Sequence, residues 1–198
     1  MTFCRGRLKW LFLLLLAGAV CLGHPHSFID YKFELHFDLL GLTGIRANWW
    51  FDEMFSSYVK TYDENQDGAF NDTELKMLKK EAFDNLKDYD YFSTIYINDK
   101  PFKVEFVKDF SAVYEGHQIK YSFLIPCHVT ALPTGKSLVV MFFDPTYYID
   151  VAPVKESAVS VDQAGNMKVD IQRVERKEDA YYQKMIIPEG HLIQFKRQ

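Results

Sequence analysis

The strict alternation of apolar and polar residues over 27–39 is the feature that most limits what this chain can fold into. One set of alternate side chains is apolar or aromatic: Ile29, Tyr31, Phe33, Leu35 and Phe37. The positions between them are polar, with Phe28 as the exception. Since successive side chains of a strand point to opposite faces, this pattern predicts a strand with one buried face. A turn at 40–44 and a second alternating run at 45–52 predict an antiparallel partner.

Further strand-like runs predict that most of the chain is β-structure. They occupy residues 93–97, 103–113, 118–125, 137–143, 158–161 and 167–174. Short strands separated by turns favour an antiparallel, sandwich-like β-rich domain. Helical periodicity at 53–62 and 72–86 adds a helix–loop–helix insert over 53–86, so the predicted class is α+β. The tail from about residue 175 is polar and mixed, and helix, loose packing and disorder all stay open for it.

The segment 63–74 has the ligand spacing of an EF-hand calcium loop. Oxygen ligands are expected at loop positions 1, 3, 5, 7, 9 and 12: Asp63, Asn65, Asp67, the Ala69 carbonyl, Asn71 and Glu74. Gly68 permits the sharp turn at position 6, and Phe70 is expected to anchor the loop to a core. An acidic surface turn followed by a helix cap is the alternative. Because EF-hands usually pair and the sequence has no second loop of this kind, a structural calcium site is favoured over a switch.

Residues 1–23 have the pattern of a secretory signal peptide. Three basic residues precede an apolar run over 10–22 and a small residue, Gly23. The run is short for a membrane span, which needs about 20 apolar residues. We expect cleavage after Gly23, a single domain over 24–198 in the periplasm or otherwise exported, and no stable membrane span. Cleavage after Ala19, an uncleaved anchor and a lipoprotein at Cys21 are alternatives, and the large Val20 argues against the last.

Charge and cysteine content exclude several classes of function. The net charge of −4 becomes −7 once the three basic residues of the leader are removed, so nucleic-acid binding is not expected. Cys4 and Cys21 lie in the leader, which leaves Cys127 alone in the mature chain. An intrachain disulfide and a cysteine zinc cluster are therefore excluded, and Cys127 is expected to be buried among apolar neighbours.

After cleavage at Gly23 the chain would begin His24-Pro25-His26. The free amine and the two imidazoles could together bind zinc, nickel or copper. Pro25 has no N–H, which rules out a square-planar amino-terminal copper site that needs the second amide. Further ligands could come from one acidic residue and four histidines: Asp30, His36, His117, His128 and His191. A solvated strand end is the alternative.

Other polar clusters favour structural roles. The segment 144–148, which begins with Asp144, is typical of a turn with packed tyrosines, and a site there is the less favoured interpretation. Asp52 and Glu53 are expected to cap the incoming helix, where negative charge is favourable, rather than to act as general acid and base.

Five motifs together resemble an uncharacterised family of bacterial exported proteins, labelled as the periplasmic component of an ABC-type transport system. They are residues 24–26, 50–56, the calcium-type loop, 89–92 and 144–148, and the resemblance covers roughly 24–161. Members are often encoded beside, or fused to, nickel/cobalt-type membrane transporters, and some are linked to zinc. The resemblance implies that His24 and His26 are metal ligands and that the partner is a membrane metal transporter.

These observations lead to a first hypothesis of an exported, non-enzymatic metal-binding accessory protein for transition-metal transport, with a structural calcium site. The second is a calcium-stabilised extracytoplasmic interaction module without a transition-metal role. A copper oxygenase with an amino-terminal histidine brace is a third and more remote class.

Overall fold

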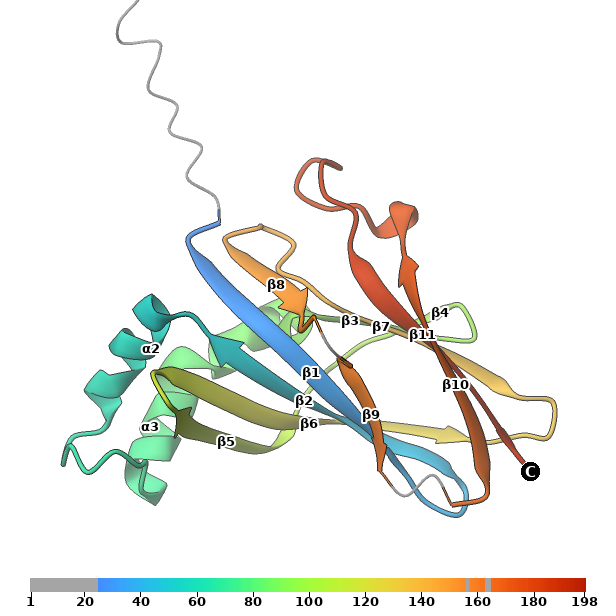
Figure 1. Cartoon of the computed structure of the whole chain (residues 1–198), viewed down its shortest axis with the longest axis horizontal. Helices are drawn as coiled ribbons and strands as arrows, with labels where there is room; N and C mark the ends of the chain where they lie inside the picture. Colours follow the sequence, from blue (N-terminus) through green and yellow to red (C-terminus); the bar gives the residue numbers. More distant parts are fainter. Residues whose placement is uncertain (1–24, 156, 163–164) are drawn as a thin grey trace, which may run out of the picture.

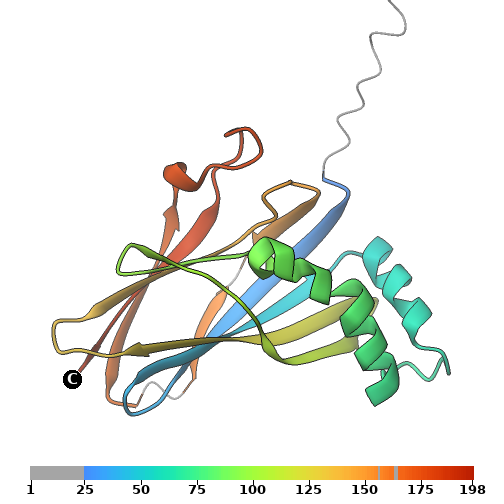
Figure 2. The same ribbon diagram turned by 180° about the vertical axis from the view of Figure 1, so that it is seen from behind.

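The computed structural model describes residues 25–155, 157–162 and 165–198, which form two β-sheets and a helical insert. Both views place the insert at one end of the molecule, beside β5 and away from β10 and β11 (Figure 1, Figure 2). The predicted signal peptide and His24 lie outside the described residues. No helix in the described ranges is long and apolar enough to cross a membrane.

The first sheet has the strand order β5-β6-β2-β1-β8, with β9 also beside β1. Its strands are β1 (Ser27–Phe37), β2 (Gly41–Phe51), β5 (Lys108–Glu115), β6 (Gln118–Thr130), β8 (Ile149–Pro153) and β9 (Val159–Asp162). The pairs among β5, β6, β2 and β1 are antiparallel, as the sequence predicted. However, β8 and β9 run parallel to β1 along successive halves of its free edge.

The second sheet has the order β10-β11-β7-β3-β4 and is antiparallel throughout. Its strands are β3 (Ser93–Ile97), β4 (Lys100–Phe102), β7 (Lys136–Phe142), β10 (Met167–Glu175) and β11 (Glu189–Arg197). The expected single strand over 103–113 is not formed, because β5 begins only at Lys108. The tail that the sequence left open contains β11, which lies between β10 and β7.

Aromatic side chains from both sheets meet in a shared core. All five apolar residues of the alternating set in β1 are buried, which confirms its predicted inner face. The Tyr31 and Phe142 rings lie 4.9 Å apart, and those of Phe37 and Phe195 lie 5.3 Å apart. The predicted α+β class with mostly antiparallel sheets is therefore confirmed.

The helical insert leaves the first sheet after β2. It contains α2 (Glu53–Val59), the 3₁₀ turn η1 (Lys60–Tyr62), the segment 63–71, α3 (Asp72–Ala82) and the 3₁₀ segment η2 (Asp84–Phe92). Leu78 and Phe83 bury this insert against the core, and the Phe83 ring lies 5.1 Å from that of Phe123 on β6. A third 3₁₀ element, η3 (Lys177–Asp179), belongs to the connection between β10 and β11.

Candidate functional site

The predicted calcium loop, residues 63–74, begins directly after η1 and ends in the first turn of α3. Gly68 has φ +84°, a conformation that L side chains rarely adopt, and a Cβ placed there would have no neighbour within 4 Å. Gln66 also has positive φ. The glycine is therefore required by backbone conformation rather than by crowding.

The acidic side chains at the two ends of the loop fold back onto its backbone. The Asp63 carboxylate accepts hydrogen bonds from the amides of Asp67 and Gly68, at 3.2 and 3.0 Å. The Glu74 carboxylate accepts from the amides of Glu64 and Asn71, at 3.1 and 2.9 Å. These hydrogen bonds keep the loop compact, with both carboxylates directed into it.

The middle of the loop and the start of α3 are fixed by shorter-range bonds. Asn65 donates to the Asp67 carboxylate at 3.0 Å, and Asp67 accepts from the amide of Ala69 at 2.9 Å. Asn71 caps α3 by accepting from the amides of Thr73 and Glu74, and Glu74 completes a capping box. Asn71 and Glu74 therefore also serve helix capping, the alternative to calcium binding.

An aromatic contact docks the loop on the edge of the first sheet. The Phe70 and Tyr114 rings are stacked with centroids 5.1 Å apart, so Phe70 anchors the loop as predicted. The Tyr114 hydroxyl is buried with no hydrogen-bond partner in the described chain. Burial, and then the negative charges of Asp63 and Glu74, raise the pKa of Tyr114 to about 12. Sequence reasoning missed Tyr114, because nothing in its local pattern links it to a loop forty residues earlier.

The negative charge of the carboxylates inside the loop is not neutralised by ion pairs. Asp63 is 8% exposed and Glu74 is 3% exposed, yet the described residues supply no ion pair to either of them or to Asp67. Carboxylates, amide oxygens and a backbone carbonyl are the donor set that calcium prefers, so the residues fit the ion in type. In the described conformation, however, no three His, Cys, Asp or Glu side chains gather as a group that could hold a metal ion.

The predicted transition-metal histidines are not assembled into one site in the described part of the chain. His26 is exposed at the start of β1, where its amide donates to the Tyr148 carbonyl at 2.8 Å and its ring lies 4.8 Å from that of Tyr148. His117 and His128 are exposed elsewhere, and His191 is buried on β11.

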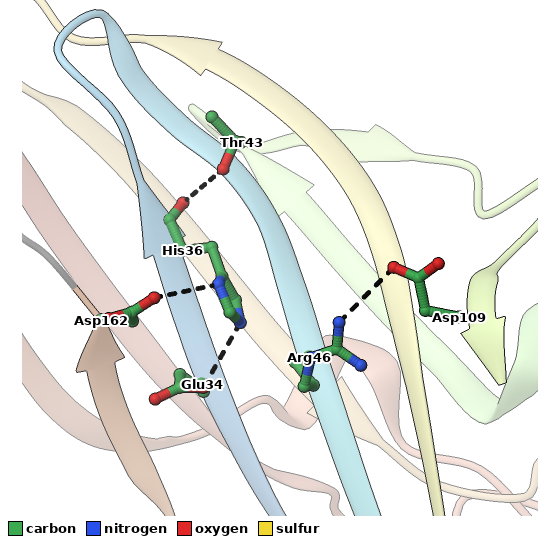
Figure 3. Close-up of polar contacts among 6 residues, drawn as sticks. All are labelled: Glu34, His36, Thr43, Arg46, Asp109 and Asp162. Carbon is green, nitrogen blue, oxygen red and sulfur yellow. Dashed lines mark hydrogen bonds and ion pairs between the residues drawn. The ribbon is translucent and has the colours of Figure 1, made fainter. Parts of the chain in front are cut away.

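His36 lies on the outer face of β1 between two carboxylates, as Figure 3 shows. Its Nε2 is 3.4 Å from Glu34 and its Nδ1 is 3.3 Å from Asp162 of β9, while Arg46 pairs with Asp109 at 3.5 Å. The two ring nitrogens face different carboxylates, so they do not converge on one ion. Exposed ion pairs of this kind contribute little to stability, about 0 to 1 kcal/mol each.

The remaining polar candidates have structural roles. Asp52 caps α2 by accepting from the amide of Phe55 at 2.8 Å, as expected. Asp144 accepts from the amides of Thr146 and Ile149, which closes the predicted turn before β8. Cys127 is buried, as predicted.

The family model for a protein of unknown function, DUF1007, matches residues 9–190. The chain belongs to this family. It is 29% identical to an uncharacterised 15.5 kDa protein from the trpE 3′ region of Spirochaeta aurantia, over 66% of this chain and 92% of the relative. It is also 31% identical to an uncharacterised protein of Haemophilus influenzae, over 70% of this chain and 66% of that protein. The expectation of an uncharacterised family is thus confirmed.

One motif of the DUF1007 chain has unusual backbone geometry. Asp90, Tyr91 and Phe92 all have φ near +50°, although none is glycine. Such residues cost free energy and persist only where the surrounding structure fixes them. Here Tyr91 and Phe92 are buried, and the Ser93 hydroxyl donates to the Tyr91 carbonyl at 2.8 Å. The motif therefore forms a rigid reversal of chain direction that joins the insert to β3.

Proposed function

We propose that this chain is an exported metal-binding accessory protein that supports transition-metal transport or homeostasis and carries a structural calcium site. The calcium part of the proposal depends on one observation above all. Asp63 and Glu74 are nearly fully buried in a loop with EF-hand spacing, and neither forms an ion pair within the described chain. Buried charge is costly unless it is paired or binds a metal ion.

Calcium binding would exchange backbone hydrogen bonds for ion contacts. The carboxylates of Asp63 and Glu74 would release the backbone amides from which they now accept hydrogen bonds and would bind the ion instead. Asp67, Asn65, Asn71 and the Ala69 carbonyl would complete its coordination. A bound ion would then fix α2 relative to α3 and, through Phe70, fix both helices on Tyr114 of β5. This supports a bracing role rather than a switch.

Calorimetric titration with calcium chloride tests the site. We expect a Kd in the range of extracellular modules, roughly 10⁻⁴–10⁻³ M. At a hundredfold excess over Kd, calcium would stabilise the fold by about 2.7 kcal/mol. Asp63→Asn and Glu74→Gln should each abolish this gain, and glutamine preserves the capping box at Glu74.

Glu64→Gln is the matched control, because Glu64 is exposed in the same loop and occupies a non-ligand position. It should bind calcium like the wild type. A wild-type melting temperature that does not change with calcium would remove the calcium site from the proposal.

The transition-metal part is supported by the family resemblance and by the exposed position of His26 at the start of β1. With His24 at the mature amino terminus, the amine and two imidazoles would form a site for zinc, nickel or copper, for transfer to a membrane transporter. Intact mass and amino-terminal sequencing of the exported protein would establish the cleavage site.

Zinc, nickel and copper titrations of that mature protein complete the test. The double variant His24→Ala with His26→Ala should lose most of the affinity, whereas His117→Ala, an exposed histidine at the β5–β6 turn, should retain it. Equal affinity in all three proteins would favour the second candidate, a calcium-stabilised interaction module. If calcium raises stability and the transition metals do not, the interaction module is favoured, because the loop already docks on β5 through Phe70.

A further inference from the structure

A cleft of about 300 Å³ is lined by residues of β8 and of the β10–β11 connection. These two segments lie at the same end of the molecule (Figure 1). One wall is β8 of the first sheet, through Val151 and Pro153. The opposite wall is formed by Arg173 of β10, Glu189 of β11 and the connection before it. This volume is at the lower end of the range for ligand sites, so it suits only a small molecule.

Strand register places charged side chains on the inner face of the second sheet at this end. His191 alternates with the buried Ile193 and Phe195 along β11, so all three face the first sheet. Arg173 is directly opposite His191 in the β10–β11 pair and therefore shares that face. Glu189 lies two residues before His191 and shares it too. The inner face is thus apolar in the middle of the sandwich and charged where the sandwich opens.

Two buried polar atoms in the core behind the cleft lining have no hydrogen-bond partner in the described chain: the Tyr31 hydroxyl and His191 Nδ1. Tyr31 is fully buried, His191 is 5% exposed, and their ring centroids are 6.5 Å apart. Buried polar groups without partners are rare and costly, so the core next to the cleft is less well satisfied than the middle of the sandwich.

Both orphan groups experience the charges that line the cleft. Burial, and then the positive charge of Arg173, lower the pKa of His191 to about 4, so its ring is neutral at pH 7. Burial, and then the negative charge of Glu189, raise the pKa of Tyr31, while Arg173 partly opposes the rise. Tyr31 therefore presents a hydroxyl and His191 a neutral ring beside Arg173 and Glu189.

Both positive and negative side chains line the cleft, and they form few close ion pairs with one another. Arg173 and Glu189 approach to 3.9 Å at a single contact, with both side chains about half exposed. Asp150 and Lys155 also line the cleft and form no ion pair within the described chain. The remaining wall is apolar and includes Phe142.

We propose that this cleft binds a small zwitterion with an apolar side chain, of the size and charge pattern of a free α-amino acid. Its carboxylate would face Arg173 and its ammonium would face Glu189, since these neighbouring opposite charges complement the two charges of an α-amino acid. The apolar side chain would contact Phe142 and the connection. This site is separate from the calcium loop and does not depend on metal binding.

Calorimetry with L-leucine and L-phenylalanine tests the site, and two half-molecules serve as controls. These are 4-methylpentanoate, which lacks the ammonium, and 3-methylbutylamine, which lacks the carboxylate. We expect saturable binding of at least one amino acid with a Kd on the order of 1 mM or tighter, and about tenfold weaker binding of each half-molecule. No saturable heat with either amino acid, or half-molecules that bind equally well, would overturn the proposal.

Variants separate a binding role from a structural one. Arg173→Gln and Glu189→Gln, the two cleft variants, should each weaken binding by about tenfold or more, whereas Tyr31→Phe, behind the cleft lining, should leave the affinity unchanged. Because the Tyr31 hydroxyl has no partner, Tyr31→Phe should not lower the melting temperature of the ligand-free protein. Lys177→Gln, an exposed basic residue on the same connection, should bind like the wild type. Unchanged affinity in both cleft variants would overturn the assignment.

Discussion

Asp52 joins three parts of the molecule through one carboxylate. It accepts from the Ser27 hydroxyl and the Phe28 amide at 2.6 Å each, and from the Phe55 amide at 2.8 Å. The start of β1 and the first turn of α2 are thus fixed by the same side chain. Burial alone would raise the pKa of Asp52, but these hydrogen bonds outweigh it and the pKa is lowered.

Asp52→Ala should therefore destabilise the protein in a pH-dependent way. The folded-state pKa lies below the ordinary value of about 3.9, so the stabilisation is complete above about pH 4 and is lost as pH falls through the folded-state pKa. Urea unfolding at pH 7 should show a loss of about 1 to 2 kcal/mol. The difference from wild type should shrink near pH 3, and the exposed control Asp88→Ala should change little at either pH. A loss that is equal at both pH values would contradict the assigned role.

Cys127 should be chemically inert in the folded protein. Burial raises the pKa of its thiol to about 12, and the thiolate is the reactive form. Peptide mapping after iodoacetamide treatment at pH 8 should find Cys127 unmodified, and fully modified when urea is present. Rapid alkylation without denaturant would mean that β6 opens locally.

At the scale of elements, the β1–β2 turn depends on Gly41. It has φ +153°, and a Cβ there would lie 2.2 Å from the Val129 carbonyl oxygen on β6. Strand β6 approaches so closely because the Ala131 amide donates to the Leu40 carbonyl at 2.8 Å. The turn is therefore locked to a third strand.

Gly41→Ala should destabilise the protein by roughly 3 kcal/mol or more, since it combines backbone strain with a clash against main chain. Gly116→Ala is the matched control, because Gly116 also has positive φ but open space around it. It should cost only about 1 to 2 kcal/mol. Chemical denaturation of both variants measures the difference, and equal losses would show that the contact with β6 can relax.

Elements with strong local patterns could be predicted, and those defined by distant partners could not. The alternation in β1 fixed its buried face, and the loop spacing placed α2 and α3 to within a few residues. Strand β8 was missed because Ile149–Pro153 is short, contains Asp150 and ends in proline. The residues His191, Ile193 and Phe195 do alternate as in a strand with one buried face, but the charged residues around them hid this pattern in the sequence of β11.

At the scale of the whole molecule, stability depends on contact between the sheets, and Phe142 is at its centre. Its ring lies 4.9 Å from Tyr31 and 6.2 Å from Trp49, which belong to the opposite sheet. Phe142→Ala should cost about 3 to 5 kcal/mol through lost burial and the cavity left behind.

Phe28→Ala is the comparison for that loss, because Phe28 is 53% exposed on the outer face of β1. It should change stability by no more than about 0.5 kcal/mol. Thermal unfolding of both variants by calorimetry checks the contrast. Similar losses would mean that the two sheets do not share one core.

The candidate sites also differ in how far sequence could predict them. Sequence alone could propose all six calcium ligands, because they lie within one segment of fixed spacing, and calcium binding there stays a prediction. The cleft lined by Val151, Arg173 and Glu189 was not predicted, because these residues of β8, β10 and β11 meet only when the two sheets pack together. Glu189 also lies in the tail whose structure the sequence left open.

The position of β1 also sets the order in which the molecule can be assembled. It is the first strand in the chain, yet Ser27 pairs with Ile149 and Phe33 with Val159, each more than a hundred residues later. Its second edge therefore stays uncovered until most of the polypeptide is present. Pairings of such long sequence separation slow folding. A chain of this topology would remain without its completed sheet during synthesis, and the sheet would close only after β8 and β9 have been made.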